Sequence, residues 1–269
     1  MNGKKYRSFF RIRFLNGLQY RTAALSGILT QFAWGFLMIS MFRAFSRSAP
    51  ESFPMEFSQL SSYVWLNQAL LTLFMVWQFE QDIFTSITQG NVAYELCRPF
   101  DLYANWFLKS AAGRISKAVL RCFPVLFFSF FLPEPFGLSL PSSPIHFLFF
   151  LVSGFFSVLV VVSLVMIVYI LTFFTMSSTG IRIAFTTLGD FLSGGILPLP
   201  FFPEQIKWIV ELLPFACIQD VPLRAFIGDI TGTEFLFRLS LQIFWACVLI
   251  LGGRRLMKTA LQHVVVQGG

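Results

Sequence analysis

One acidic side chain stands within an otherwise apolar stretch of this sequence. Asp190 lies in the run TTLGDFLSGG, with Gly189 before it and Gly194 and Gly195 after it. A carboxylate at membrane depth is costly to bury, so such residues commonly line a polar pathway, relay protons or bond to another helix. The glycines permit close helix packing or a break in the helix. We therefore take Asp190, Gly194 and Gly195 as candidates for a pathway site or for a structural contact, including one with a partner subunit.

No other residues have the spacing of a catalytic or metal-binding site. The sequence lacks the G-x-x-x-x-G-K-[ST] loop that holds nucleotide phosphates, and it lacks the H-E-x-x-H and G-x-S-x-G motifs. The two histidines, His146 and His263, fall on opposite membrane faces in the topology derived below, and the four cysteines fit no metal spacing. The sequence therefore predicts no catalytic residue, no metal site and no cofactor bound by this chain.

The segment GNVAYELCRP, from Gly90 to Pro99, has the features of a docking helix. Asn91 is a favourable N-cap residue, residues 92–97 provide just under two helical turns, and Pro99 disfavours helical geometry in the residue before it. The segment belongs to the longest polar connection between apolar stretches, residues 80–114. This position suits a contact with a cytoplasmic partner, and an ordinary connecting turn is the alternative.

The composition places these residues in a membrane protein. Of 269 residues, 56% are hydrophobic and 12% are charged, whereas an average soluble domain is about 25% charged. This excludes a disordered chain, a basic nucleic-acid binder and a disulfide scaffold. A membrane helix needs about 20 predominantly apolar residues. Six segments qualify as predicted spans: 22–41, 61–79, 115–132, 145–172, 181–201 and 235–251.

The positive charges indicate the orientation of these spans. Of the 20 Lys and Arg residues, 15 fall on the face that holds both termini, and the opposite face has five of them with eight of the 13 acidic residues. The positive-inside rule then places both termini in the cytoplasm. The net charge of +7 therefore reports topology, and no nucleic-acid partner is expected.

Two segments are expected to lie along the membrane surfaces. Residues 1–21 carry apolar residues near helical spacing, interleaved with Arg7, Arg11 and Arg13, which predicts an amphipathic helix with its arginines at anionic lipid headgroups. A plain cytoplasmic extension of the first span is the alternative. Prolines divide residues 203–226 into pieces too short to span, which predicts a re-entrant pair of short helices or a flat interfacial loop.

The order of these features resembles the membrane subunits of bacterial ATP-binding-cassette (ABC) exporters, the type-two permease family. Three features carry the resemblance: the six-span order with its basic amphipathic N-terminal helix, the segment GNVAYELCRPFDLYANWFLK, and the segment SGGILPLPFFPEQIKWIVELLPF. Together they cover nearly the whole chain. The sequence is most similar to a subgroup of small permeases that often pair with a second, related permease.

The resemblance implies an all-α polytopic protein, a single domain over residues 1–269, in the bacterial plasma membrane. It implies a permease without its own nucleotide site, which forms the pathway with a second permease, identical or related. Two ABC ATPase subunits, which bind ATP and Mg²⁺, would drive it and move the second and fifth spans. The family's coupling helix corresponds to residues within region 80–102, namely Gly90, Tyr94, Glu95, Leu96, Arg98 and Pro99.

The sequence departs from the family pattern just before Gly90. Many relatives carry an Arg-Glu or Glu-Lys pair at the two preceding positions, where this chain has Thr88 and Gln89. The polar contact to the ATPase is therefore expected from another acidic side chain of this region: Glu80, Asp82 or Glu95.

A second hypothesis belongs to another functional class. An ATP-independent channel or proton-coupled carrier would use Asp190 as its intramembrane acid. An intramembrane enzyme is the third class, and the sequence offers no catalytic constellation for it.

Overall fold

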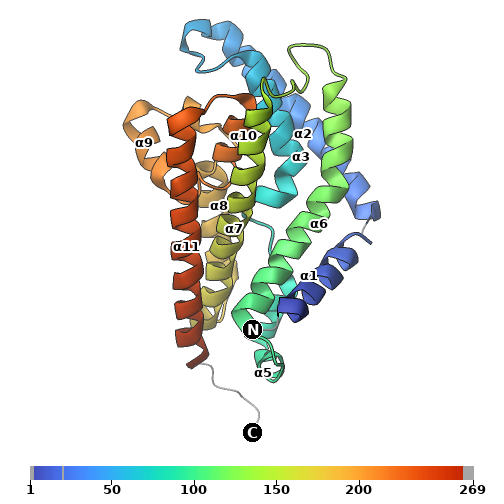
Figure 1. Cartoon of the computed structure of the whole chain (residues 1–269), viewed down its shortest axis with the longest axis vertical. Coiled ribbons are helices and arrows are strands. Elements are labelled where there is room, and N and C mark those ends of the chain that lie inside the picture. The colour runs from blue at the N-terminus through green and yellow to red at the C-terminus, as the bar shows by residue number, and fades with distance from the viewer. Residues whose placement is uncertain (1–2, 20, 263–269) are drawn as a thin grey trace.

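The structure is a computed structural model that describes residues 3–19 and 21–262, and His263 lies outside these residues. Every regular element in the described residues is helical, and the longer helices run roughly along the long axis of the molecule (Figure 1). The α-helices are α1 (Gly3–Gly17), α2 (Arg21–Ser48), α3 (Phe57–Phe74), α4 (Gln81–Thr88), α5 (Val92–Leu96), α6 (Leu102–Phe130), α7 (Pro144–Thr175), α8 (Thr179–Leu192), α9 (Glu204–Leu212), α10 (Asp220–Ile227) and α11 (Gly232–Gln262). Two short 3₁₀ helices are η1 (Pro50–Ser52) and η2 (Leu199–Phe201).

Helix α7 forms the centre of the fold. Its residues 160–170 are buried on all sides, apart from a partly exposed Ile167. A helix that is apolar all round belongs in the interior of a large protein or in a membrane. Helices α11, α10, α6 and α4 pack directly on α7, and α3 packs on α6 and α2.

The distribution of side chains is the one expected in an apolar solvent. Large apolar side chains are exposed on the outer helices, for example Leu29 of α2, Phe123 of α6 and Phe244 of α11. Polar side chains are instead buried within the bundle, including Asn67 and Gln68 of α3. Exposed apolar surface on this scale would promote aggregation in water, whereas in a membrane it contacts lipid without a loss of free energy.

Three helices of the described residues are long and apolar enough to cross a membrane: the part of α2 from Ala24 to Ser48, α7, and α11. Helices α3, α6 and α8 overlap predicted spans but fall outside this group. Helix α3 buries polar side chains, α6 carries four cations, and the 14 residues of α8 rise only about 21 Å against a hydrocarbon core of about 30 Å. The described residues thus form an all-helical membrane protein, and the six-span order stays a prediction.

The helix that follows the predicted docking segment begins earlier than expected. Helix α6 starts at Leu102 instead of residue 115, because the carboxylate of Asp101 accepts a hydrogen bond from the Ala104 N–H at 2.8 Å and caps the helix. Helix α3 ends at Phe74 instead of residue 79. The following backbone carbonyls turn toward a buried guanidinium described below.

Three other helices also differ at their ends from the predicted spans. Helix α8 ends at Leu192 rather than at residue 201, since Gly194 adopts a left-handed φ of +82° and prolines follow. Helix α2 continues beyond residue 41 to Ser48, and α11 covers 232–262 rather than 235–251. Their additional turns carry charged residues, which favour water beyond the apolar core.

The two ends of the molecule carry different short elements. Helices α1 and α5 lie toward one end, and α9 and α10 lie toward the other (Figure 1). Helix α1 crosses α6 obliquely and packs on it. The predicted docking segment and the predicted re-entrant segment are therefore separated by the length of the bundle.

Candidate functional site

Helix α5 presents two large apolar side chains to solvent. Tyr94 is 73% exposed and Leu96 is 47% exposed, whereas Val92 is buried and anchors the helix. The turn before α5 is made by Gly90, whose φ of +74° is readily adopted only by glycine. Arg98 and Pro99 follow the helix and are also exposed. An exposed aromatic and aliphatic pair on so short a helix is typical of an interface anchor.

The Asn91 side chain does not cap α5 as the sequence predicted. Its amide instead donates to Gln89 Oε1 at 3.2 Å, and Asn91 itself has helical backbone angles. The turn at Gly90 supplies the first bonds, because the Ala93 N–H donates to the Gly90 carbonyl at 3.3 Å.

Glu95 points into the protein rather than toward a partner. Its two carboxylate oxygens accept hydrogen bonds from Ser86 of α4, at 3.0 Å, and from the Trp106 indole N–H of α6, at 2.7 Å. Glu95 therefore ties α5 to both neighbouring helices. Among the acidic residues expected to contact an ATPase, Asp82 is ion-paired with Lys109 and remains largely exposed, and Glu80 lies against Gly113 of α6.

The N-terminal helix is attached to the end of this segment. Lys5 Nζ donates to the Pro99 carbonyl at 2.7 Å and stands 5.0 Å from the centre of the Phe100 ring. Tyr6 and Phe9 of α1 contact the same ring at centroid distances of 5.8 and 6.0 Å. Helix α1 is thus positioned to move together with α5 and the start of α6.

The predicted lipid-contacting arginines occupy two different environments. Arg7 and Arg11 are exposed. Arg13 is partly buried, stands 5.3 Å from the centre of the Phe9 ring and lines a cavity beside α6.

A buried arginine joins α6 to the end of α3. Arg114 is 1% exposed, and its guanidinium donates to the carbonyls of Met75 at 2.6 Å and Gln78 at 2.8 Å. These carbonyls belong to the connection between α3 and α4, and α4 leads on to α5. In the sequence, Arg114 is one of the 15 positive charges on the face that holds both termini and has no other distinguishing feature. Its role depends on long-range contacts that the local sequence does not indicate.

Helix α8 is attached to α4 at the same end of the bundle. Arg182 of α8 donates to Gln81 Oε1 at 3.3 Å, and its guanidinium stands 5.1 Å from the centre of the Phe84 ring of α4. Helix α4 therefore contacts α5 through Ser86 and Glu95, and α8 through Arg182. Helix α4 follows the predicted second span in the sequence and contacts α8, which begins the predicted fifth span. These two spans are therefore connected next to the docking segment.

The glycines after α8 lie where the chain leaves the helix. Tyr63 of α3 donates its hydroxyl to the Gly194 carbonyl at 3.1 Å, and the Asn67 amide of α3 donates to the Gly195 carbonyl at 3.0 Å. Asp190, one turn earlier, is partly buried. Its carboxylate forms no ion pair or hydrogen bond within the part of the chain that the structure describes. The sequence-based alternative of a contact with another helix of this chain is therefore absent from the described residues.

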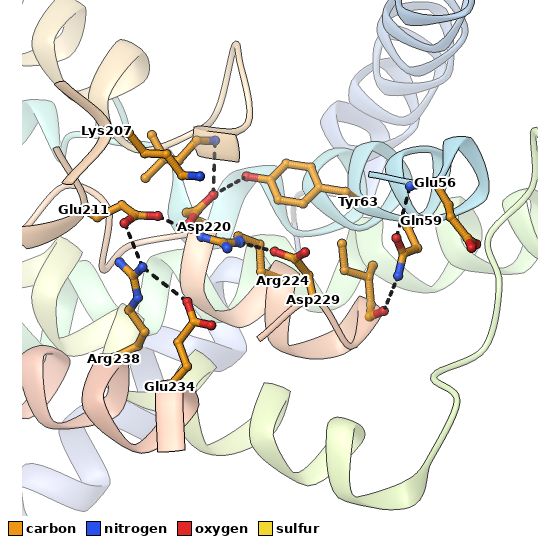
Figure 2. Close-up of polar contacts among 12 residues, drawn as sticks. Glu56, Gln59, Tyr63, Lys207, Glu211, Asp220, Arg224, Asp229, Glu234 and Arg238 are labelled. Atoms are coloured by element: carbon orange, nitrogen blue, oxygen red, sulfur yellow. Dashed lines mark hydrogen bonds and ion pairs between the residues drawn. The ribbon is translucent and has the colours of Figure 1, made fainter. Parts of the chain in front are cut away.

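A cluster of charged side chains at the opposite end was missed by the sequence analysis (Figure 2). We call it the α10 charge cluster; it comprises Glu211, Asp220, Arg224, Asp229, Glu234 and Arg238. Arg224 contacts three carboxylates, and its side chain is 8% exposed. Arg238 joins Glu211, at 2.7 Å, to Glu234, at 3.4 Å. The cluster ties α9, α10 and the start of α11 together.

The α10 charge cluster is also joined to the break after α8. Asp220 accepts from the Leu199 N–H at 3.3 Å and lies 3.5 Å from the hydroxyl of Tyr63, which in turn holds Gly194. The two contacts of Tyr63 join residues more than 130 positions apart, so spacing along the chain could not reveal them. No group of three or more metal-ligating side chains suited to a metal ion occurs among the described residues.

A family model described as ABC-2 family transporter protein matches residues 55–268. The chain belongs to the ABC-2 transporter family. This confirms the resemblance drawn from the sequence, and it identifies the chain as a membrane-embedded permease component of an ABC transporter. Permeases of this family normally work with ABC ATPase partners. No curated protein matches the chain.

The family match includes α3 to α11 and therefore both ends of the ABC-2 permease described above. Helix α1, with Arg7, Arg11 and Arg13, precedes the matched residues. The contacts of α1 with Pro99 and Phe100 are observed in the structure, and the family match does not include α1.

Proposed function

We propose that this permease is the transmembrane subunit of an ATP-driven exporter and that α5 is its coupling helix. The subunit carries no nucleotide site of its own and binds two ABC ATPase subunits, which hold ATP and Mg²⁺. It pairs with a second permease, identical or related, in the bacterial plasma membrane. The exposure of Tyr94 and Leu96 on a short helix at one end of an ABC-2 permease is the observation that carries the proposal.

The proposed topology has six spans and two cytoplasmic termini. The spans are α2, α3, α6, α7, α8 with the segment that follows it, and α11. Helix α8 is too short to cross alone, so the chain through η2 completes that span. Helices α9 and α10 form the proposed re-entrant hairpin on the external side, and α1 lies on the cytoplasmic surface.

The proposed mechanism uses contacts that link α5 to the spans. An ATPase that seats Tyr94 and Leu96 moves α5, and Glu95 passes this movement to α4 and α6 through its two hydrogen bonds. Arg114 passes it to the end of α3, and Arg182 passes it to α8. Movement of the ATPases would thereby shift several spans together.

Co-purification of the tagged permease with its ATPase tests this assignment. We expect the double substitution of Tyr94→Ser and Leu96→Ser to lower the retained ATPase by about tenfold or more, because central apolar anchors each contribute about 1–2 kcal/mol to an interface. The matched control is Trp208→Ser with Leu212→Ser, an exposed apolar pair on α9 at the other end of the molecule. Retention of the ATPase by the α5 variant, or its loss only in the α9 variant, would refute the assignment.

A further inference from the structure

A cavity of about 500 Å³ lies between α1, α2 and α6, beside Glu80 in the connection between α3 and α4. Its volume is many times the roughly 30 Å³ that one water molecule occupies in the liquid. We call it the basic cavity because four cationic side chains line it, namely Arg13, Lys109, Lys117 and Arg121. The coupling helix and the α10 charge cluster do not contribute to its lining.

Three glycines allow the helices around the basic cavity to approach closely. A Cβ atom at Gly27 of α2 would lie 2.6 Å from the guanidinium carbon of Arg121. A Cβ atom at Gly113 of α6 would lie 2.9 Å from a carboxylate oxygen of Glu80, and one at Gly17 of α1 would overlap the Ser116 side chain. The absence of side chains at these positions leaves room for the charged groups to face one space.

The cations of the basic cavity outnumber the carboxylates that face it. Glu80 is the one acidic residue among the lining side chains, against four cations, and the ion pair of Lys109 is with Asp82, which does not line the cavity. Lys117 is partly buried; it interacts electrostatically with Glu80 but forms no ion pair or hydrogen bond within the described residues. An excess of positive charge in a partly buried space is stabilised when an anion enters it.

The arrangement of these cations favours a phosphate group. Arg and Lys side chains are the usual protein ligands of phosphate, through charge-assisted hydrogen bonds. Lys109, Lys117 and Arg121 share one face of α6 at spacings of eight and four residues, which extends over about 18 Å of the helix. Arg13 reaches the same space from α1, and the amide of Asn16 adds a neutral donor. Cations from two helices, α1 and α6, therefore line the space that a phosphate group would enter.

The surroundings of the basic cavity favour a lipid over a soluble anion. Ala24 lines it near the start of the first proposed span, where lipid headgroups meet the cytoplasmic surface. Helices α2 and α6 also expose Leu29 and Phe123, which suit acyl chains. We propose that the basic cavity binds the phosphate headgroup of an anionic phospholipid from the cytoplasmic leaflet. This inference rests on the orientation given in the proposed function.

Lipid binding by the purified, delipidated permease tests the proposal. Native mass spectrometry would count adducts of phosphatidylglycerol, and of phosphatidylcholine with the same acyl chains, over a concentration series. Inorganic phosphate at millimolar concentration would compete in a parallel series. The variants are Lys117→Gln and Arg13→Gln, with Lys117→Arg to restore the charge. The matched control is Lys258→Gln, an exposed lysine on the last turns of α11.

We expect preferential binding of phosphatidylglycerol, weakened about tenfold by Lys117→Gln and by Arg13→Gln and preserved in Lys117→Arg and Lys258→Gln. Equal binding of the two lipids, or equal losses in Lys117→Gln and Lys258→Gln, would overturn the site. Displacement of the lipid by inorganic phosphate would overturn the lipid source and assign the cavity to a soluble anion. Each variant's ATPase co-purification is measured separately, so a failed lipid site is distinguishable from a failed coupling assignment.

Discussion

Arg224 is the central cation of the α10 charge cluster, and its removal should destabilise the permease strongly. In Arg224→Met the guanidinium is lost from three carboxylates, at 3.1 Å from Glu211, 3.3 Å from Asp220 and 2.5 Å from Asp229. Glu211 keeps its bond to Arg238, and Asp229 is partly exposed. Asp220 is only 2% exposed and is left without a cation.

Two independent estimates give the size of this effect. Breaking a buried ion pair by removing one partner costs about 3–5 kcal/mol. Alternatively, Asp220 can take up a proton when it loses its partner. From an ordinary pKa of about 3.9, protonation at pH 7 costs at most about 1.36 × 3.1, or about 4 kcal/mol, and it costs less because burial already raises the pKa of Asp220 in the unsubstituted protein. We therefore expect Arg224→Met to lower the free energy of unfolding by about 3–4 kcal/mol.

The assay is equilibrium unfolding of the purified permease by sodium dodecyl sulfate in mixed micelles, followed by tryptophan fluorescence. A double-mutant cycle with Asp220→Asn isolates the pair, and a coupling energy of about 2–3 kcal/mol is expected because Asn carries no charge to leave buried. Arg255→Met, at an exposed position of α11, is the control and should change stability by less than about 0.5 kcal/mol. Coupling below about 0.5 kcal/mol would show that the cluster is not a stabilising unit.

The loss of stability in Arg224→Met should increase as the pH rises. Burial raises the pKa of Asp220, which lies in α10 between the proposed spans, and Arg224 lowers it in part. Arg224→Met therefore leaves this pKa further raised in the folded state. A carboxyl whose pKa is higher in the folded than in the unfolded protein costs no stability at a pH below the unfolded pKa. As the pH rises above that value, it destabilises the folded state increasingly. The deficit of the variant should grow between pH 5 and pH 7, by up to about 1.4 kcal/mol per pH unit. A deficit that is constant over this range would contradict the reasoning.

Two further substitutions address the movement of the spans and the intramembrane acid. Arg114→Met should lower ATP-dependent transport in proteoliposomes with little change in ATPase co-purification, because it releases the end of α3 from α6 while leaving α5 in place; transport equal to wild type would show that this contact carries no movement. Asp190→Asn should keep most of the ATP-driven transport, since no described contact depends on its charge; loss of transport in this variant, with unsubstituted protein that transports without ATP and stops when the proton gradient is collapsed, would instead support the proton-coupled carrier.

Residue types and local spacing predicted much of the docking region. The turn at Gly90 and the stop at Pro99 bracket a helix that the structure places at Val92–Leu96. Local patterns also predicted short helices, or a flat interfacial loop, for residues 203–226; the structure has α9 within this range and α10 extending one residue beyond it. These features depend on φ preferences and proline sterics, which act over only a few residues.

Directions of side chains in the same region were not predictable. Glu95 was expected to be available to an ATPase, but it bonds Ser86 and Trp106 inside the protein. Arg114 gave no local signal for its bonds to the Met75 and Gln78 carbonyls. Both outcomes depend on how α6 packs against α3, α4 and α5, and helical spacing in a single segment contains no information about that packing.

The sequence by itself determined the solvent and the fold class of this protein. An excess of apolar residues cannot be buried in a soluble core of this size, and backbone groups in lipid must bond within helices. Only the tertiary structure decided where the sparse charges meet: Arg224 with its three carboxylates, Arg114 with carbonyls, and four cations around one cavity. Charge energies depend on distance and burial in three dimensions, and sequence separation fixes neither of these.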